Sequence, residues 1–417
     1  MIVAVGLLRG ARSARLRIFA CLLAALLLAA APPLCAAAFI FDRRQFLAGV
    51  YNETSETSIV WYSTTQSGSP LAMANVSAGP NVSWITPHPS LPVVYTVQES
   101  GTGIIRAFAL HAATYTMSAL GTSQSSGGNY PVHASVHPSG RFLFVANYGG
   151  SVAVLPLLRD GTPLPPLQVL NTGPLAHCVI MSPVNSDHVF VVSLAKDSID
   201  QYLFNRSSGL LSPNPLAAAL HLPPGTGPRH LLIHPLHPMA FIADEGNGTT
   251  AALVSVCAYD ASRGTLALLA SFSAIPQGAD AKGLFPSELI LSRDGRFLYV
   301  SVRDAAGSRD SVAVFLVQPA TCDVRLLANA PVCWYPRSMT LMQGDAADVL
   351  AVGCQLDRRI QTLLLDRESG MLQAAGQAAA VSDAVAFVGD TSQVGMHHAP
   401  SIRPRTTHWT TAPSMIL

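Results

Sequence analysis

The sequence predicts an all-β fold, a seven-bladed β-propeller with four antiparallel strands per blade. The first observation is a repeated hairpin, two apolar runs joined by a turn that often carries Pro or Gly, whose six copies start about 50 residues apart. The second is the composition, because 31 Gly and 30 Pro spread over 417 residues indicate many short strands rather than long helices. Four strands in about 50 residues match the size of one propeller blade.

The six hairpins follow one another through the chain. They begin at Trp84, Ala134, Val179, Leu231, Leu289 and Met339. Residues 39–51 are the candidate for a seventh blade, whereas the run AVAFV from Ala384 has no hairpin of its own. We therefore expect the two chain ends to pair within one blade, because closure removes unpaired strand edges. The propeller should occupy residues 39–389, with a tail at 390–417. A pair of β-sandwiches is the alternative, and the regular spacing of the repeats argues against it.

Residues 1–38 have the features of a secretory signal peptide. Four arginines precede the apolar run Ile18–Ala31, and small residues suited to cleavage follow at about 36–38. The run of about 14 residues is short of the ~20 that a membrane span needs. An organelle transit peptide is the alternative, but transit peptides are amphipathic and this run is uniformly apolar. We expect a protein secreted or held in the secretory lumen, with no membrane span after cleavage.

Secretion carries two further expectations. Acceptor sites for N-glycosylation occur at Asn52, Asn75, Asn81, Asn205 and Asn247. Signal cleavage would leave five cysteines, too few and too scattered for a disulfide framework. If one bridge forms, Cys322 and Cys333 are the pair that the sequence suggests, since they flank one short segment. No cysteine or histidine spacing is typical of zinc, and no metal or cofactor is expected.

The charge of the chain excludes some functions. Charged residues make up 12 % of the sequence, about half the usual ~25 %, and apolar residues make up 49 %, which argues against disorder. Lys plus Arg is 25 and Asp plus Glu is 24, so no basic surface for nucleic acid is indicated. A closed propeller has no obligatory need for a partner subunit, and we expect a monomer.

Polar residues recur where the hairpins should meet one rim of the ring. In a blade, the start of the first strand and the end of the second reach the same face, so we expect residues that face each other across that rim to share a constant offset in the sequence. Residue pairs 16 apart at these places are Ser83 with Glu99, His177 with Ser193, Arg229 with Glu245 and Ser287 with Arg303. Other copies place His133 with Asn147 and Tyr148, and Arg337 with Cys354 and Gln355, at the same points. We expect this cluster to line one mouth of the central channel.

Such a cluster favours acyl chemistry on an anionic substrate. Arginine binds carboxylate or phosphate through two parallel hydrogen bonds, and it also stabilises charge growing on a carbonyl oxygen. Either Glu245 or His177 could take a proton from water, and the sequence leaves this choice open. No serine nucleophile motif is present. His234 and His237, in the segment HPLHP, are expected to lie in a solvated turn.

Three segments carry a more specific pattern. They are GGNYPVHASVHPSGRFLFVANYGGSVAVLPL from Gly127, GPRHLLIHPLHPMAFIADE from Gly227 and LILSRDGRFLYVSVRD from Leu289. At these residues the chain resembles the seven-bladed propeller lactonases, which include propeller-type 6-phosphogluconolactonases and carboxy-cis,cis-muconate cyclases. The resemblance covers almost all of the chain beyond the signal. It implies the catalytic residues His177, Arg229, Glu245 and Arg303, and the substrate-binding residues His133, Asn147, His230 and Arg337.

The segment VVSLAKD from Val191 departs from the acidic pattern of the family, which leaves the substrate open. Three functions remain at this stage. The first is hydrolysis of a small sugar-acid lactone, as in the 6-phosphogluconolactonases. The second is closure of a lactone, as in the cyclases, and the third is a secreted propeller that binds a ligand without catalysis. Lactone turnover would separate the enzymes from the binding protein.

Overall fold

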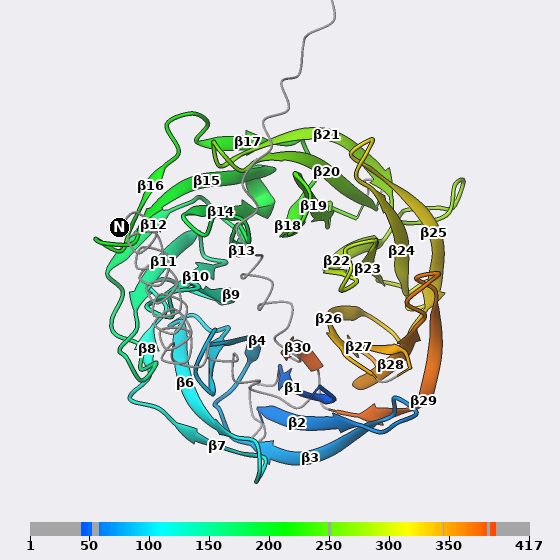
Figure 1. Cartoon of the computed structure of the whole chain (residues 1–417), viewed down its shortest axis with the longest axis horizontal. Helices are drawn as coiled ribbons and strands as arrows, with labels where there is room; N and C mark the ends of the chain where they lie inside the picture. Colours follow the sequence, from blue (N-terminus) through cyan, green and yellow to red (C-terminus); the bar gives the residue numbers. More distant parts are fainter. Residues whose placement is uncertain (1–42, 52–57, 249–251, 345, 382–383, 389–417) are drawn as a thin grey trace, which may run out of the picture. The chain divides into compact units, whose positions relative to one another are not determined.

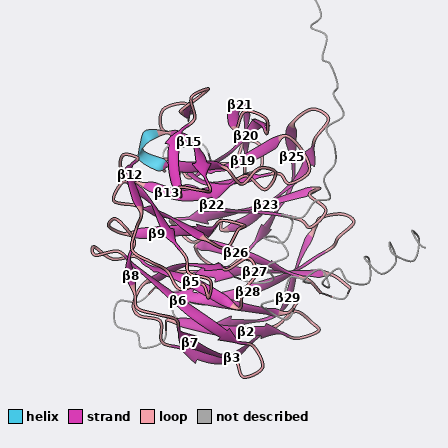
Figure 2. Cartoon of the chain, turned by 60° about the vertical axis from the view of Figure 1, so that its left-hand side comes forward, coloured by secondary structure: helices cyan, strands magenta, loops and turns pink. Residues whose placement is uncertain are grey.

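The structure, a computed structural model, describes residues 43–51, 58–248, 252–344, 346–381 and 384–388. Within these residues the regular structure is β-strand apart from one 3-10 turn, η1 (Leu194–Lys196), as Figure 2 shows. The strands form seven antiparallel sheets arranged in a ring (Figure 1). The predicted fold class, a seven-bladed β-propeller with four strands in each blade, is confirmed.

We number the blades along the chain and give the strands of each from the channel outward. Blade 1 holds β30 (Ala384–Val388), β1 (Gln45–Val50), β2 (Ile59–Thr64) and β3 (Pro70–Val76). Blade 2 holds β4 (Val82–Pro87), β5 (Val93–Gln98), β6 (Ile104–His111) and β7 (Thr116–Ala119), with β8 (Gln124–Ser125) also beside β6. Blade 3 holds β9 (Pro131–Val136), β10 (Phe142–Asn147), β11 (Ser151–Pro156) and β12 (Gln168–Asn171).

The remaining blades follow the same order. Blade 4 holds β13 (Ala176–Met181), β14 (His188–Ser193), β15 (Ser198–Asn205) and β16 (Leu210–Pro213), with β17 (Ala219–His221) also beside β15. Blade 5 holds β18 (Pro228–Ile233), β19 (Met239–Asp244), β20 (Leu253–Asp260) and β21 (Thr265–Ser273). Blade 6 holds β22 (Leu284–Leu291), β23 (Phe297–Asp304), β24 (Ser311–Gln318) and β25 (Asp323–Pro331). Blade 7 holds β26 (Pro336–Met342), β27 (Asp348–Cys354), β28 (Arg359–Leu365) and β29 (Leu372–Ala380).

The core lies between neighbouring blades. Every residue of β10 is buried, on both faces of its sheet, because blades 2 and 4 pack against blade 3 from either side. A strand buried on both faces reads as a continuous apolar run rather than as an alternating one. This is why the second strand of each hairpin was so visible in the sequence. The outer strands, such as β7, are largely exposed.

Blade 1 closes the ring with both ends of the described chain. β30 is its innermost strand and pairs antiparallel with β1, with Phe387 opposite Ala48. The expectation that the chain ends pair within one blade is therefore confirmed. Each innermost strand contacts the next around the ring, and β30 lies between β26 and β4. The proposed signal peptide at 1–38 and the tail at 390–417 lie outside the described residues.

The prediction of a solvated turn is wrong for His234. Its ring is fully buried, and Nε2 lies 3.1 Å from the carbonyl oxygen of Gly295 in blade 6. Nδ1 accepts hydrogen bonds from the amides of Leu236 and His237, both at 3.1 Å. The ring thus caps its own turn and ties blade 5 to blade 6. The sequence alone does not show that a second blade covers this turn.

The predicted cysteine pairing is also wrong. Cys333 bonds to Cys354, with 5.6 Å between the two Cα atoms, whereas Cys322 is a free thiol. Cys322 lies in the turn before β25, and Cys333 lies just beyond the other end of that strand. Nine residues of strand at about 3.3 Å each place the two roughly 30 Å apart. Cys354, at the end of β27, is instead next to Cys333 because β26 and β27 form one hairpin.

Candidate functional site

A β-bulge begins the innermost strand of all seven blades. In β18, Pro228 pairs with Asp244 and His230 with Ala243, so that Arg229 has no partner on β19. The same irregularity occurs in β4, β9, β13, β22, β26 and β30, at Ser83, Val132, His177, Ser287–Glu288, Arg337 and Val385. A bulge re-aims the side chain of the extra residue. In five of the blades, those of β4, β13, β18, β22 and β26, the extra residue is polar or charged, so that the bulge directs a polar side chain to one mouth of the channel.

The expectation that residues 16 apart in the sequence face each other across the rim is wrong. The amide of Glu245 donates to the carbonyl of Gly227 at 2.8 Å, which makes Glu245 the first residue after β19. Arg229 is the bulged residue of β18. The constant spacing reflects a constant hairpin length, with one residue from each strand end at the same rim. The residues that directly follow second strands at this rim include Tyr51, Glu99, Tyr148, Glu245 and Gln355.

One carboxylate oxygen holds two arginines. Oε2 of Glu245 lies 2.9 Å from Nε of Arg229 and 3.0 Å from Nη2 of Arg303. Nη1 of Arg229 donates to the carbonyl oxygen of Ser287 at 3.0 Å. The guanidinium of Arg303 lies 5.1 Å from the ring centroid of Tyr335. These contacts fix both guanidinium groups beside each other, with Arg303 contributed by blade 6 and the other two residues by blade 5.

Glu245, Arg229 and Arg303 form a trio in which the two positive charges stabilise the negative charge of the carboxylate. Burial alone would raise the pKa of Glu245, but Arg303 and Arg229 outweigh it and hold the pKa below its ordinary value. Glu245 is therefore ionised at neutral pH. Burial and the nearby charge of Arg303 lower the pKa of Arg229 to about 10, against the opposing effect of Glu245. Arg229 thus remains a cation at neutral pH.

Three histidines fill the space between the inner strands next to this trio. The ring centroids of His177 and His230 are 5.1 Å apart, and those of His133 and His230 are 5.6 Å apart. The Trp84 ring packs on His133 at 4.1 Å. Nδ1 of His230 lies 2.8 Å from Oε1 of Glu288, which orients its ring. Aromatic side chains from β4, β9, β13 and β18 thus form the floor of the mouth.

His177 differs from its neighbours in its hydrogen bonding. Its Nδ1 is buried and has no hydrogen-bond partner among the described residues. Burial, followed by the charges of Arg229 and His230, holds its pKa well below the ordinary value. His177 is therefore neutral at neutral pH. A neutral imidazole with an unused nitrogen can accept a proton from a bound water or substrate.

Sequence reasoning missed Glu288. The two arginine-bearing segments, Pro228–Arg229–His230 and Pro336–Arg337–Ser338, both start with Pro at the head of an inner strand. Pro286–Ser287–Glu288 occupies the same place in β22. Aligning these triplets would have put Glu288 beside His230. The hydrogen bond between them still could not be inferred, because it joins two different blades.

Arg337 forms a second, looser part of the mouth. Its Nη2 lies 3.6 Å from Oε2 of Glu99, beyond hydrogen-bond distance, and Nη1 donates to Oε1 of Gln355 at 3.3 Å. The guanidinium also lies 5.8 Å from the ring centroid of Tyr51. Burial raises the pKa of Glu99, and Arg337 only partly opposes this. The charge of Arg337 also lowers the pKa of Glu245, which places it within electrostatic reach of the trio.

Asn147 stands apart from the other predicted residues. Its side chain is fully buried, and Nδ2 donates to the carbonyl of Ser126 at 3.0 Å and to Oγ of Ser151 at 3.1 Å. These bonds tie blade 3 to the segment that precedes it. The structure therefore brings together His133, His177, Arg229, His230, Glu245, Arg303 and Arg337, and leaves Asn147 in a supporting position.

Two aspartates hold the segments that carry the arginines. The carboxylate of Asp197 accepts hydrogen bonds from the amides of Gly225 and Gly227, at 2.8 and 2.6 Å, just before Arg229. Asp197 belongs to the segment in which the sequence departs from the family pattern. Oδ1 of Asp310 accepts from the amides of Asp304 and Tyr335, both at 2.9 Å. It thus anchors the residue after Arg303 and the ring that packs on it.

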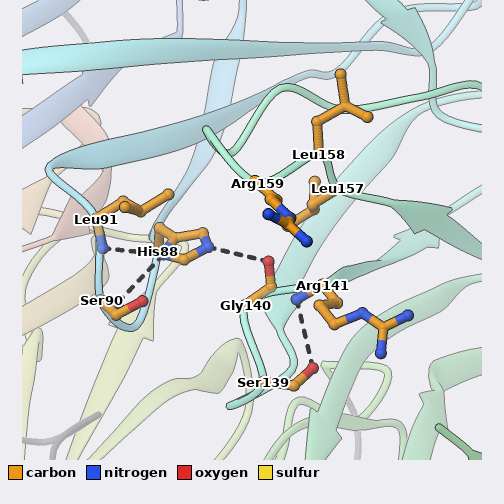
Figure 3. Close-up of a pocket in the computed structure, with 9 residues that line it drawn as sticks. All are labelled: His88, Ser90, Leu91, Ser139, Gly140, Arg141, Leu157, Leu158 and Arg159. Atoms are coloured by element: carbon orange, nitrogen blue, oxygen red, sulfur yellow. Dashed lines mark hydrogen bonds between the residues drawn. The ribbon is translucent and has the colours of Figure 1, made fainter.

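A separate cavity of about 660 Å³ lies at the other end of the first strands. It is lined by His88, Ser90, Leu91, Ser139, Gly140, Arg141, Leu157, Leu158 and Arg159 (Figure 3). The ring of His88 caps its own turn and bonds to the carbonyl oxygen of Gly140 at 3.0 Å. No residue of this cavity belongs to the arginine and histidine cluster. Within the described part of the chain, no group of three or more His, Cys, Asp or Glu side chains could hold a metal ion.

Comparison with known proteins identifies the family of the chain. The family described as "Lactonase, 7-bladed beta-propeller" matches residues 45–388. A 6-phosphogluconolactonase of Serratia proteamaculans is 29 % identical over 330 residues, 78 % of this chain and 92 % of that protein. One from Formosa agariphila is 25 % identical over 324 residues, 74 % of this chain and 88 % of that protein.

A solved structure extends the likeness to three dimensions. The periplasmic gluconolactonase of Pseudomonas aeruginosa superposes with a TM-score of 0.74 at 26 % identity, covering 83 % of this chain and 98 % of that one. In the described residues, no helix has the length and apolar character to span a bilayer. The family match runs from β1 to β30, which is the whole described ring. The chain belongs to the lactonase family of seven-bladed β-propellers.

Proposed function

We propose that the protein hydrolyses a sugar-acid lactone, as the names of its 6-phosphogluconolactonase and gluconolactonase relatives suggest. The observation that carries the proposal is the position of Glu245. One oxygen of its carboxylate holds both Arg229 and Arg303, and the charge of Arg229 acts on the neutral His177. Two preorganised cations beside an unprotonated base are what acyl transfer to water requires.

In this mechanism the arginines act as electrophiles. N–H groups of Arg229 and Arg303 donate to the lactone carbonyl oxygen and stabilise the negative charge that grows on it as water attacks. Glu245 keeps the two guanidinium groups in place and limits their repulsion. Because their geometry is set before the substrate arrives, little reorganisation is needed in the transition state.

In the proposed mechanism, His177 carries the proton from the attacking water to the leaving group. It accepts a proton from the attacking water, whose oxygen forms a bond to the carbonyl carbon. The ring C–O bond then breaks, and the proton passes from His177 to the departing alkoxide, giving an open-chain hydroxy acid. Glu245 is less suited to this role, because Oε2 of its carboxylate already holds both arginines.

The test is lactone turnover by the mature protein beginning near residue 39. The panel contains 6-phosphoglucono-δ-lactone, glucono-δ-lactone and a lactone without sugar hydroxyls, each corrected for spontaneous hydrolysis. We expect a rate above background for at least one sugar lactone, and loss of that rate in Arg229→Ala. Rates equal to spontaneous hydrolysis for the whole panel would overturn the proposal and favour a binding protein.

We also propose that the protein travels through a secretory compartment. The Cys333–Cys354 disulfide supports this, because disulfides persist in oxidising compartments and are rare in the cytosol. The signal-like pattern of residues 1–38 points the same way. Amino-terminal sequencing of the purified protein is the direct test, and recovery of the uncleaved chain from cytosol would contradict the proposal.

A further inference from the structure

The three arginines of the mouth are held differently. Arg229 and Arg303 lie 2.9 and 3.0 Å from the same carboxylate oxygen, whereas Arg337 lies 3.6 Å from the nearest carboxylate oxygen, that of Glu99. The side chain of Arg337 is 19 % exposed, against 4 % and 5 % for the other two. Arg337 is therefore the arginine that is most open to an incoming ligand and least saturated by its own partner.

The described neighbours of Arg337 orient its guanidinium but do not use all of its hydrogen-bond donors. Gln355 accepts one hydrogen bond from Nη1 at 3.3 Å, and the Tyr51 ring lies 5.8 Å from the guanidinium. Tyr51, Gln355 and Glu99 come from blades 1, 7 and 2, so this arginine lies where three blades meet. Within the part of the chain that the structure describes, its guanidinium has N–H groups with no acceptor at hydrogen-bond distance, because the Glu99 oxygen is 3.6 Å away.

We infer that Arg337 is the specificity residue of the mouth, and that it binds an anionic group, phosphate or carboxylate, at the end of the substrate remote from the lactone carbonyl. This inference rests on the proposed lactone chemistry, since it assigns the remaining arginine of the same site. Arg229 and Arg303 are committed to Glu245 and face the reacting carbonyl. The two arginines that already have a close carboxylate act on the reacting group, and Arg337, which lacks one among the described residues, recognises the remote end of the substrate.

Glu99 weakens the binding of an anion by Arg337. Among the described residues its carboxylate forms the ion pair with Arg337, so an anion bound by Arg337 would compete with it for the same guanidinium. The Ser83 hydroxyl and the charge of Arg229 also lower the pKa of Glu99, and the charge of Glu99 raises the pKa of Tyr148. Burial already disfavours the charged form of Glu99, which makes displacement by a stronger anion easier. Removing its charge should strengthen anion binding.

The experiment compares three open-chain acids that differ only at C6. Gluconate carries a hydroxyl there, glucarate a carboxylate and 6-phosphogluconate a phosphate. Binding of each to the mature protein is measured by isothermal titration calorimetry, which needs no turnover. We expect both C6 anions to bind more tightly than gluconate, and the larger of the two gains to identify the natural anion.

Variants then assign the gain to Arg337. Arg337→Gln should reduce the preference for the C6 anion over gluconate by about 10- to 100-fold, the scale of a charge-assisted hydrogen bond. Arg337→Lys should restore it only in part, because a point charge lacks the two-pronged geometry. Glu99→Gln should strengthen binding of the C6 anion. The matched control is Arg359→Gln, an exposed arginine of β28 at the same rim of blade 7.

Kinetics provide the second readout. The ratio of kcat/KM for 6-phosphoglucono-δ-lactone to that for glucono-δ-lactone should fall in Arg337→Gln, with most of the change in KM. Equal binding of the three acids by the wild type, or an equal loss for all three in Arg337→Gln, would overturn the inference. A C6 preference without any lactone turnover would instead uphold the inference and reject the proposed hydrolysis.

Discussion

Glu245 and Arg303 form an ion pair of 3.0 Å between two adjacent blades. Glu245 is the first residue after the second strand of blade 5, and Arg303 lies within the second strand of blade 6. The pair therefore depends on how two sheets pack, and not on either hairpin alone. It also makes the candidate site a property of the ring, because no single blade contains both the carboxylate and its two arginines.

Removal of Arg229 should impair turnover strongly. Arg229→Ala is expected to reduce kcat/KM for the substrate lactone by about 10²–10³-fold, the scale of about 2.7–4 kcal/mol for one lost oxyanion donor. Arg229→Lys should recover only part of this, because lysine cannot donate from two nitrogens in a fixed plane. Steady-state kinetics provide the measurement, with the exposed Arg325→Ala of β25 as control. Full activity in Arg229→Lys would contradict the role of the planar guanidinium.

The rate should not follow the ordinary histidine titration. Burial and Arg229 keep the pKa of His177 well below its usual value of about 6.5, so the ring stays neutral, and able to accept a proton, as the pH falls through 6.5. Glu245 also stays ionised there, since its pKa is lowered. We expect kcat/KM to be flat between about pH 6 and 7.5 and to fall only at lower pH. An inflection centred near pH 6.5 would contradict this assignment of His177.

The role of His177 has its own test. His177→Gln should reduce kcat by at least about 100-fold, because proton transfer by a positioned base contributes roughly 10²–10⁴-fold. Substrate binding should change far less, so that KM stays within a few-fold of its wild-type value. A matched control is His221→Gln, an exposed histidine at the end of β17 in the same blade. Unchanged kcat in His177→Gln would transfer the base role to another group.

The disulfide should stabilise the protein and the arginine site together. It closes a loop of 21 residues, for which the chain-entropy model gives about 3 kcal/mol of stabilisation. Cys333 precedes Tyr335 by two residues and Cys354 is next to Gln355, so its loss should also loosen the contacts of Arg303 and Arg337. Chemical denaturation of Cys333→Ser, with Cys322→Ser as the control, measures the effect. Peptide mapping without reduction should find Cys333 joined to Cys354, and a Cys322–Cys333 peptide would refute the pairing.

Glycans, if the chain passes through a glycosylating compartment, should be confined to exposed acceptor sites. Asn75, Asn205 and Asn247 are exposed, whereas Asn81 is buried and has a positive φ of 50°. Asn52 lies outside the described residues. Treatment with an N-glycosidase followed by mass spectrometry should locate glycan at the exposed sites, and none at Asn81. A glycan found at Asn81 would show that this turn opens before the chain folds.

The sequence by itself determined the blade architecture. The hairpin HPSGRFLFVANY is visible because its second strand is buried on both faces, and a strand in that position must be apolar along its whole length. Pairing of the chain ends followed from the same reasoning, since an open ring would leave strand edges exposed. The polar residues at strand ends also stood out, because little else in the hairpins is ionisable.

Only the tertiary structure decided which of these residues meet. Bulges turn Arg229 and Arg337 toward the mouth, and the packing of blade 5 against blade 6 gives His230 its partner Glu288. Ring closure through blade 1 brings Arg337 near Glu99, although 238 residues separate them in the chain. Contacts between blades depend on the angle and distance at which whole sheets pack. Local hairpin patterns contain the strands and their turns, but that packing is set by the closure of all seven blades at once.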